Sequence, residues 1–170
     1  MASSRRRFLQ SSGAVVAFGL AGCAPGKRPP RNVAAPPLEI GKARSFQVGK
    51  PVFFHYPDDA SPAIAVKLAK PVPGGAGPSG DIVAYSQLCV HKGCPVSYHA
   101  AQETFVCPCH YSAYDPQKSG QVIIGHATTN LPRIQLAYDA SSDSLTASGV
   151  DGLIYGRFTD EALTPSSSAP

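Results

Sequence analysis

Short apolar segments separated by turn residues make up the chain from about residue 43 onward. Proline, glycine and aspartate interrupt these segments, and the glycine- and proline-rich run 71–80 must be a loop. Helical periodicity is not sustained over two turns anywhere, apart from a turn near Glu161. The pattern predicts strands, the last two forming a closing hairpin, over Ser45–Val48, Val52–His55, Ile64–Leu68, Ile82–Gln87, Thr104–Val106, Gln121–Ile124, Arg133–Ala137 and Leu145–Ala147.

Composition supports the same fold class. The chain has 170 residues, with 17 Pro, 16 Gly and no Trp, which favours one turn-rich all-β domain with appendages. We place this domain at 43–158, followed by a tail at 159–170. Six basic and no acidic residues precede Leu38, whereas nine basic and eleven acidic residues follow from there. The folded part is therefore slightly acidic, and nothing indicates a nucleic-acid-binding surface.

The N-terminus has the features of an export signal. Ser4–Gln10 (S-R-R-R-F-L-Q) matches the twin-arginine pattern except at its last position, and residues 13–23 are apolar. Those eleven residues are too few to span a bilayer, which takes about 20. We expect a signal segment at 1–24, export of the folded protein to the periplasm, and a proline-rich, basic linker at 25–42. Leu20–Cys23 is similar to a lipobox, so Cys23 is either a lipid anchor or a chance cysteine.

Two short stretches, Cys89–Cys94 (C-V-H-K-G-C) and Cys107–His110 (C-P-C-H), each offer cysteine and histidine at close spacing. Zinc would use four of the six side chains tetrahedrally and leave two unexplained. Two plain disulfides would leave both histidines without a role. An iron–sulfur cluster with two cysteine and two histidine ligands uses both residue types and leaves one spare cysteine in each stretch.

These stretches resemble the Rieske iron–sulfur family. The resemblance implies one 2Fe–2S cluster with Cys89 and Cys107 on one iron and His91 and His110 on the other, and a Cys94–Cys109 disulfide. It implies a Rieske fold of antiparallel sheets, with a small cluster-binding lobe at about 86–130 on a larger β base. It also implies hydrogen bonds to sulfur from the hydroxyls of two further residues, Ser112 and Tyr114, which favour the reduced state.

A third stretch, Gly125–Pro132 (G-H-A-T-T-N-L-P), resembles the loop that covers the cluster in this family, with Gly125, Ala127 and Pro132 at its fixed positions. His126 lies in this loop. It is either an ordinary solvated histidine or a residue near the cluster that tunes it or touches a partner.

The C-terminal half resembles the small subunit of bacterial arsenite oxidase. The similarity is carried by the runs G-C-P-V-S-Y from Gly93, D-P-Q-K-S-G-Q from Asp115 and G-L-I-Y-G-R from Gly152. It implies a molybdopterin-containing large subunit that performs the chemistry, and a cytochrome c or cupredoxin that accepts the electrons. The chain itself then has no substrate-converting residues. The alternatives are the Rieske subunit of a quinol–cytochrome c oxidoreductase and, in another class, a non-redox zinc or disulfide-stapled binding module.

Overall fold

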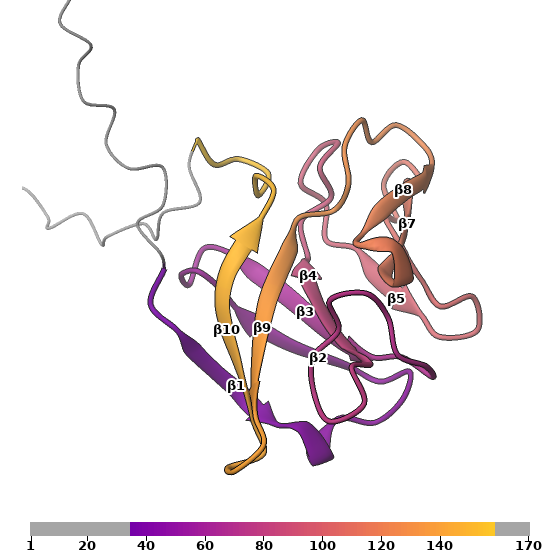
Figure 1. Cartoon of the computed structure of the whole chain (residues 1–170). Helices are drawn as coiled ribbons and strands as arrows, with labels where there is room; N and C mark the ends of the chain where they lie inside the picture. Colours follow the sequence, from indigo (N-terminus) through magenta and orange to yellow (C-terminus); the bar gives the residue numbers. More distant parts are fainter. Residues whose placement is uncertain (1–34, 159–170) are drawn as a thin grey trace, which may run out of the picture. The chain divides into compact units, whose positions relative to one another are not determined.

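A computed structural model describes residues 35–158 of the chain (Figure 1). The expected signal segment at 1–24 with Cys23, the linker up to residue 34, the tail at 159–170 and the turn near Glu161 lie outside this described part. Within it, no helix is long and apolar enough to cross a membrane.

Ten strands and two short 3-10 helices make up the described residues, among which there is no α-helix. The strands are β1 (Leu38–Lys42), β2 (Pro51–His55), β3 (Pro62–Lys67), β4 (Ile82–Ser86), β5 (Ser97–His99), β6 (Thr104–Val106), β7 (Ala113–Asp115), β8 (Gln121–Ile124), β9 (Arg133–Asp139) and β10 (Ser144–Asp151). The 3-10 helices are η1 (Ala43–Ser45) and η2 (Pro116–Lys118). The all-β class expected from the sequence is confirmed.

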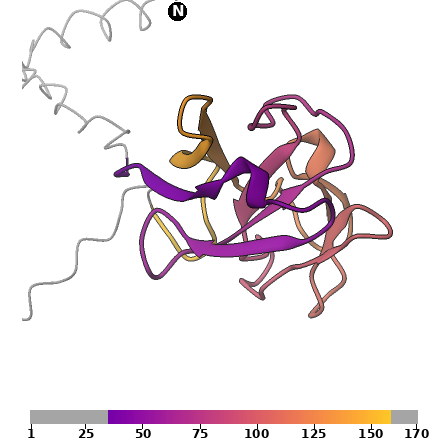
Figure 2. The same cartoon turned by 90° about the horizontal axis from the view of Figure 1, so that it is seen from below.

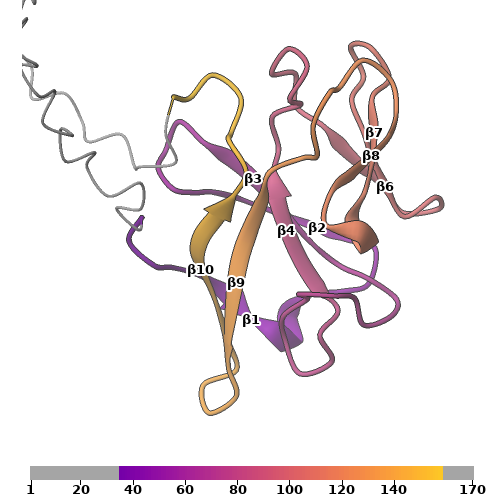
Figure 3. The same cartoon turned by 45° about the horizontal axis from the view of Figure 1, so that its top comes forward.

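The strands form two antiparallel sheets. Six strands form the base in the order β1-β10-β9-β4-β3-β2, and four form the smaller lobe in the order β5-β6-β7-β8. Figures 1 and 3 show the lobe strands on one side of β4, with β9, β10 and β1 on the other, and Figure 2 gives the view from below. The lobe is one excursion of the chain between β4 and β9.

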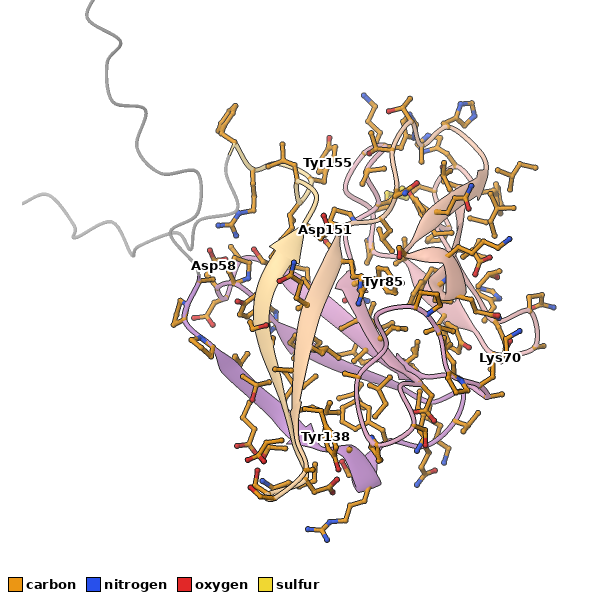
Figure 4. The ribbon with its side chains drawn as sticks, in the orientation of Figure 1. Asp58, Lys70, Tyr85, Tyr138, Asp151 and Tyr155 are labelled. Atoms are coloured by element: carbon orange, nitrogen blue, oxygen red, sulfur yellow. A yellow bond between two sulfur atoms is a disulfide. The ribbon has the colours of Figure 1, made fainter. Side chains whose placement is uncertain are left out.

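The central strands β3 and β4 are buried on both faces, which explains their continuous apolar runs. Successive side chains of a strand point to opposite faces. Ala65 and Ala84 therefore pack into the core shared with β9 and β10, and Ile64 and Tyr85 into the core shared with the lobe. Tyr85 lies between the two groups of strands (Figure 4), and its hydroxyl donates a hydrogen bond to the Pro116 carbonyl, 2.8 Å away. The lobe is thus packed directly against the base.

The structure differs from the expected elements at its N-terminal edge. Residues 38–42, expected in the linker, form β1 and pair with β10. The expected strand Ser45–Val48 is replaced by η1 and a single bridge from Val48 to Lys67. The short strands β5 and β7 were not expected. Strand β1 depends on pairing with the distant β10, which the local pattern does not contain. Strands β5 and β7 pair with their sequence neighbours, but with three residues each they are too short to show an alternating pattern.

Candidate metal centre

The two Cys-His stretches form loops with the same hydrogen-bond pattern. In the first, the Cys89 N–H donates to the Cys94 carbonyl (2.9 Å) and the Gly93 N–H donates to the Cys89 carbonyl (2.7 Å). In the second, the Cys107 N–H donates to the Ser112 carbonyl (2.9 Å) and the Tyr111 N–H to the Cys107 carbonyl (3.0 Å). The fifth residue of each loop has positive φ, 72° at Gly93 and 56° at Tyr111. The loops are therefore two copies of one turn.

Each loop begins with a buried free thiol. Cys89 and Cys107 are each 1% exposed and lie in the core between lobe and base. Burial raises the pKa of the Cys107 thiol, and its hydrogen bond to Cys89 raises that pKa further. Cys89 is also buried, but hydrogen bonds from Tyr114 and from the backbone of His91 outweigh burial and lower its pKa. The thiolate form, which binds metal, is therefore more accessible at Cys89 than at an ordinary cysteine.

Tyr114 supplies the strongest polar contact to this thiol. Its hydroxyl lies 3.1 Å from the Cys89 sulfur, and the ring is fully buried. Burial and the neighbouring Cys89 raise the pKa of the Tyr114 phenol, so it keeps its proton at neutral pH. A protonated phenol facing a thiolate is the donor of this hydrogen bond.

Two imidazoles, one from each loop, lie together. The ring centroids of His91 and His110 are 4.7 Å apart, and the rings meet edge to face. His91 Nδ1 is buried and has no hydrogen-bond partner among the described residues. Burial and the neighbouring His110, His126 and Lys92 lower the pKa of His91. The imidazole is therefore held in its neutral form, which is the metal-binding form, with one buried nitrogen available to bind metal.

A disulfide joins the two loops. Cys94 and Cys109 are bonded, with their Cα atoms 6.5 Å apart. The sulfurs of these two residues and of Cys107 lie within 4.8 Å of one another. A sulfur already in a disulfide is not a thiolate, however, so only Cys107 of these three can ligate metal. Among the described residues, the thiols free to bind metal are therefore those of Cys89 and Cys107.

Removing this cross-link should destabilise the domain without removing a metal-binding side chain. The bond closes a loop with a sequence separation of 15. A loop of this length corresponds to about 3 kcal/mol in the chain-entropy treatment. We expect Cys94→Ser to lower the free energy of unfolding by about that amount. Denaturant titration of oxidised wild type, reduced wild type and the variant measures it. Equal stability of the wild type and the variant in oxidising buffer would contradict this prediction.

The third loop, at 125–132, packs onto the second. The N–H groups of His126 and Ala127 both donate to the Ser112 hydroxyl oxygen, each at 3.0 Å. Gly125 has φ +103°, and a Cβ there would lie 2.7 Å from that oxygen. Pro132, at the far end of the loop, is buried and accepts a hydrogen bond from the Ser86 N–H of β4. The loop is anchored to the ligand loops at one end and to the base at the other.

His126 lies next to the two imidazoles of the ligand loops. Its ring stacks on His91, with centroids 5.4 Å apart and an interplanar angle of 25°. It is also exposed to solvent, so both features considered for it from the sequence are present. Its position depends on the fold of the third loop, which the sequence around it does not specify.

Tyr155 is a neighbour of the site that the sequence did not single out. A Cβ at Gly93 would lie 2.5 Å from the Tyr155 ring, so the ring packs directly on the first ligand loop (Figure 4). Two residues further on, Arg157 forms a buried ion pair with Asp58 at 2.9 Å. The segment 152–157 therefore connects the ligand loop to the base. Gly93 is the one residue in the sequence that could have indicated this contact, because only glycine leaves room for the Tyr155 ring.

The donor set fits a 2Fe–2S cluster with mixed ligands. The two loops supply two buried free thiols, one of them with a lowered pKa, and two neighbouring imidazoles, one of which has a buried nitrogen without a partner among the described residues. A closed zinc site would need the same four groups but gives no reason for a buried tyrosine hydroxyl directed at a sulfur. Hydrogen bonds to ligand sulfur are a standard means of tuning iron–sulfur centres.

Comparison with known proteins gives the same result. The Rieske [2Fe-2S] domain family matches residues 38–135. The iodate reductase subunit IdrB of Denitromonas iodatirespirans is 39% identical over 163 residues, covering 94% of this chain and 87% of that protein. The cytochrome bc1 Rieske subunit of Corynebacterium glutamicum is 41% identical over 61 residues, only 35% of this chain and 15% of that one. The soluble domain of Rieske protein II from Sulfolobus acidocaldarius has a TM-score of 0.64 at 26% identity, covering 73% and 82% of the chains.

Fold and donor set together define an iron–sulfur electron-transfer protein. The chain belongs to the Rieske [2Fe-2S] family. It carries one 2Fe–2S cluster and serves as an electron-transfer subunit of an oxidoreductase complex. The zinc or disulfide-stapled binding module considered as an alternative is set aside by this membership.

Proposed function

We propose that Cys89 and Cys107 hold one iron of the cluster and that His91 and His110 hold the other. The observation that carries this assignment is the convergence of two buried free thiols and two imidazoles from two similar loops. The Nδ1 of His91 would be the nitrogen that binds iron, which is supported by its burial without a hydrogen-bond partner among the described residues. When bound, such a cluster takes up and releases one electron, at about −150 to +300 mV in Rieske centres.

Ser112 and Tyr114 are proposed to raise the reduction potential by donating hydrogen bonds to sulfur. Deleting one such bond costs about 1 kcal/mol, which corresponds to about 40 mV for a one-electron couple. We expect Ser112→Ala and Tyr114→Phe each to lower the potential by tens of millivolts. Protein-film voltammetry measures both, with His99→Ala, an exposed histidine on β5, as the control. An unchanged potential in Tyr114→Phe would remove that hydroxyl from the proposed role.

The complex is proposed to convert a small oxyanion at a site in a separate large subunit, and arsenite oxidation is the first candidate. Two of the three runs similar to the arsenite oxidase small subunit meet in the structure, because Tyr155 of the third run packs on Gly93 of the first. This contact supports the interpretation that the two runs form one scaffold or interface, and that their similarity to the arsenite oxidase small subunit is not accidental. The large subunit in this proposal contains molybdopterin and delivers electrons to the present chain.

Iodate reduction is the second candidate. It is favoured by a relative named as an iodate reductase subunit that matches nearly the whole of both chains. The quinol–cytochrome c oxidoreductase has less support, because the cytochrome bc1 relative matches only 35% of this chain. The first two candidates differ in the direction of electron flow, since an oxidase sends electrons out through the Rieske subunit and a reductase receives them.

Purification of the complex from its host tests this proposal. The full chain with an affinity tag should co-purify with a molybdopterin-containing protein encoded beside it. Arsenite-dependent reduction of cytochrome c by the complex would establish the oxidase, and iodate-dependent oxidation of a reduced carrier would establish the reductase. Co-purification with a cytochrome b would instead support the quinol oxidoreductase and contradict the proposal.

The acceptor is proposed to be a cytochrome c or cupredoxin that docks over the two imidazoles. His110 is exposed, as are the side chains of Tyr111 (74%), the next residue in the chain, and of Ile124 (67%), which pairs with Ala113 of β7. An apolar patch around a redox site is a suitable surface for brief contact with a small carrier. Lys92 is the charged residue of the first ligand loop, which favours an acidic rim on the partner.

Export is proposed to proceed through the twin-arginine signal, with the large subunit carried along. The signal precedes the domain and the cluster is inserted before export, so the chain must cross the membrane folded. We expect Arg5→Lys with Arg6→Lys to leave both subunits in the cytoplasm. Cell fractionation followed by detection of both chains measures this. A large subunit that still reaches the periplasm would contradict co-export, and radiolabelled lipid in the wild type but not in Cys23→Ala would establish an anchor.

A further inference from the structure

One hydroxyl oxygen holds the first residues of the third loop in place. Ser112 is fully buried, and its Oγ accepts hydrogen bonds from two consecutive backbone N–H groups, those of His126 and Ala127. A serine hydroxyl has two acceptor lone pairs and one donor hydrogen. Both lone pairs are used by the loop, so the hydrogen remains to be donated elsewhere. Ser112 can therefore hold the loop through its oxygen and at the same time donate its hydrogen to another acceptor.

The backbone of the loop approaches Ser112 too closely for any side chain. A Cβ on Gly125 would contact the Ser112 Cα and lie 2.8 Å from its backbone nitrogen. Gly125 also has φ +103°, which L-residues with a side chain rarely adopt. The hydroxyl and the glycine are thus the two halves of one contact between segments that are distant in sequence.

This contact places His126 against a proposed ligand. The His126 N–H is one of the two groups bound to Ser112, and the His126 ring stacks on His91. Ala127, bound through the second N–H, is buried beneath the loop at 8% exposure. Loss of the hydroxyl would leave two backbone donors without their partner, one of them buried, and would release the histidine ring from its position.

We propose that Ser112 is a positioning residue that clamps the covering loop over the metal centre. Its hydroxyl fixes residues 125–127 against the second ligand loop, with the His126 ring stacked on His91, and so limits access of water and solutes to that side of the centre. The shielding of a cluster rests on the proposed ligand set, whereas the clamp itself rests only on the two hydrogen bonds and the glycine contact.

Deuterium uptake of the purified full chain, followed by mass spectrometry of peptides, tests the clamp. In Ser112→Ala we expect peptides that contain residues 125–127 to take up deuterium about tenfold faster than wild type, with the other lobe peptides unchanged. Gly125→Ala should accelerate the same peptides although the hydroxyl is present. Ser112→Thr, which keeps a hydroxyl, should restore slow uptake. Unchanged uptake in both Ser112→Ala and Gly125→Ala would overturn the clamp.

A matched control separates clamping from tuning. Tyr114→Phe also removes a hydroxyl beside a sulfur but touches no backbone of the covering loop. It should lower the reduction potential and leave uptake at 125–127 unchanged. Release of iron to the chelator bathophenanthroline should be faster in Ser112→Ala than in Tyr114→Phe. Equal release from the two variants would overturn shielding by the loop, and an altered potential with slow uptake in Ser112→Ala would assign this serine to tuning alone.

Discussion

Replacing Cys89, His91, Cys107 or His110 by alanine, one at a time, should abolish the cluster. Each variant removes one of four groups that converge from the two loops, and the 2Fe–2S core then lacks a ligand. We expect colourless protein with iron and acid-labile sulfide close to zero, against two irons in the wild type. Iron and sulfide analysis with the visible spectrum of purified protein measures this.

The controls use residues of the same type outside the ligand set. His126→Ala removes a ring that stacks on His91, and His99→Ala removes an exposed histidine of the lobe. Both should keep a full complement of iron. Cys94→Ser should also keep the cluster while losing stability, because its sulfur belongs to the disulfide. A full cluster in any of the four ligand variants would remove that residue from the site.

The reduction potential should depend strongly on pH in the alkaline range. In the proposed ligand set each imidazole would bind iron through one ring nitrogen, which for His91 would be the buried Nδ1, and the other nitrogen would keep a proton that can dissociate. The positive charge on iron is higher in the oxidised state, so the pKa of each ligand imidazole is lower in that state. Reduction therefore binds protons wherever pH exceeds the oxidised-state values.

The lower imidazole pKa in the oxidised state predicts the shape of the plot of potential against pH. Below the oxidised-state pKa values, both states carry the same protons and the potential is flat. Above them, the potential should fall by about 59 mV per pH unit with one proton taken up, and about twice that with two. The apparent values belong to the coupled pair and not to either histidine alone. Voltammetry of the intact centre from neutral to strongly alkaline pH measures this, and a flat potential throughout would contradict two imidazole ligands.

The two Cys-His loops could be located in the sequence because their turns are local. Each loop is closed by hydrogen bonds within six residues, and cysteine and histidine at those spacings have few other uses together. The strand at Gln121–Ile124 was also located with its observed bounds. Gly93 illustrates a local requirement that is visible in the sequence, since its positive φ favours glycine.

Features that depend on distant contacts could not be predicted in the same way. Residues 38–42 follow two prolines, and their sequence predicts a linker. They form strand β1 only because they pair with β10. Tyr111 also has a positive φ, as Gly93 does, but no residue pattern predicts it. The stacking of His126 on His91 depends on the contact of its loop with Ser112, fourteen residues earlier in the chain. Burial and pairing of this kind are properties of the fold and not of the local sequence.

Pulsed electron paramagnetic resonance of the reduced protein, produced with ¹⁵N-labelled histidine, tests the central claim most directly. An unpaired electron on a cluster with two imidazole ligands couples strongly to one nitrogen of each ring. We expect two strongly coupled histidine nitrogens in the wild type and in His126→Ala, since the stacked ring binds no iron. A reduced cluster that shows no coupled histidine nitrogen would mean cysteine ligation alone and would contradict the assignment of His91 and His110.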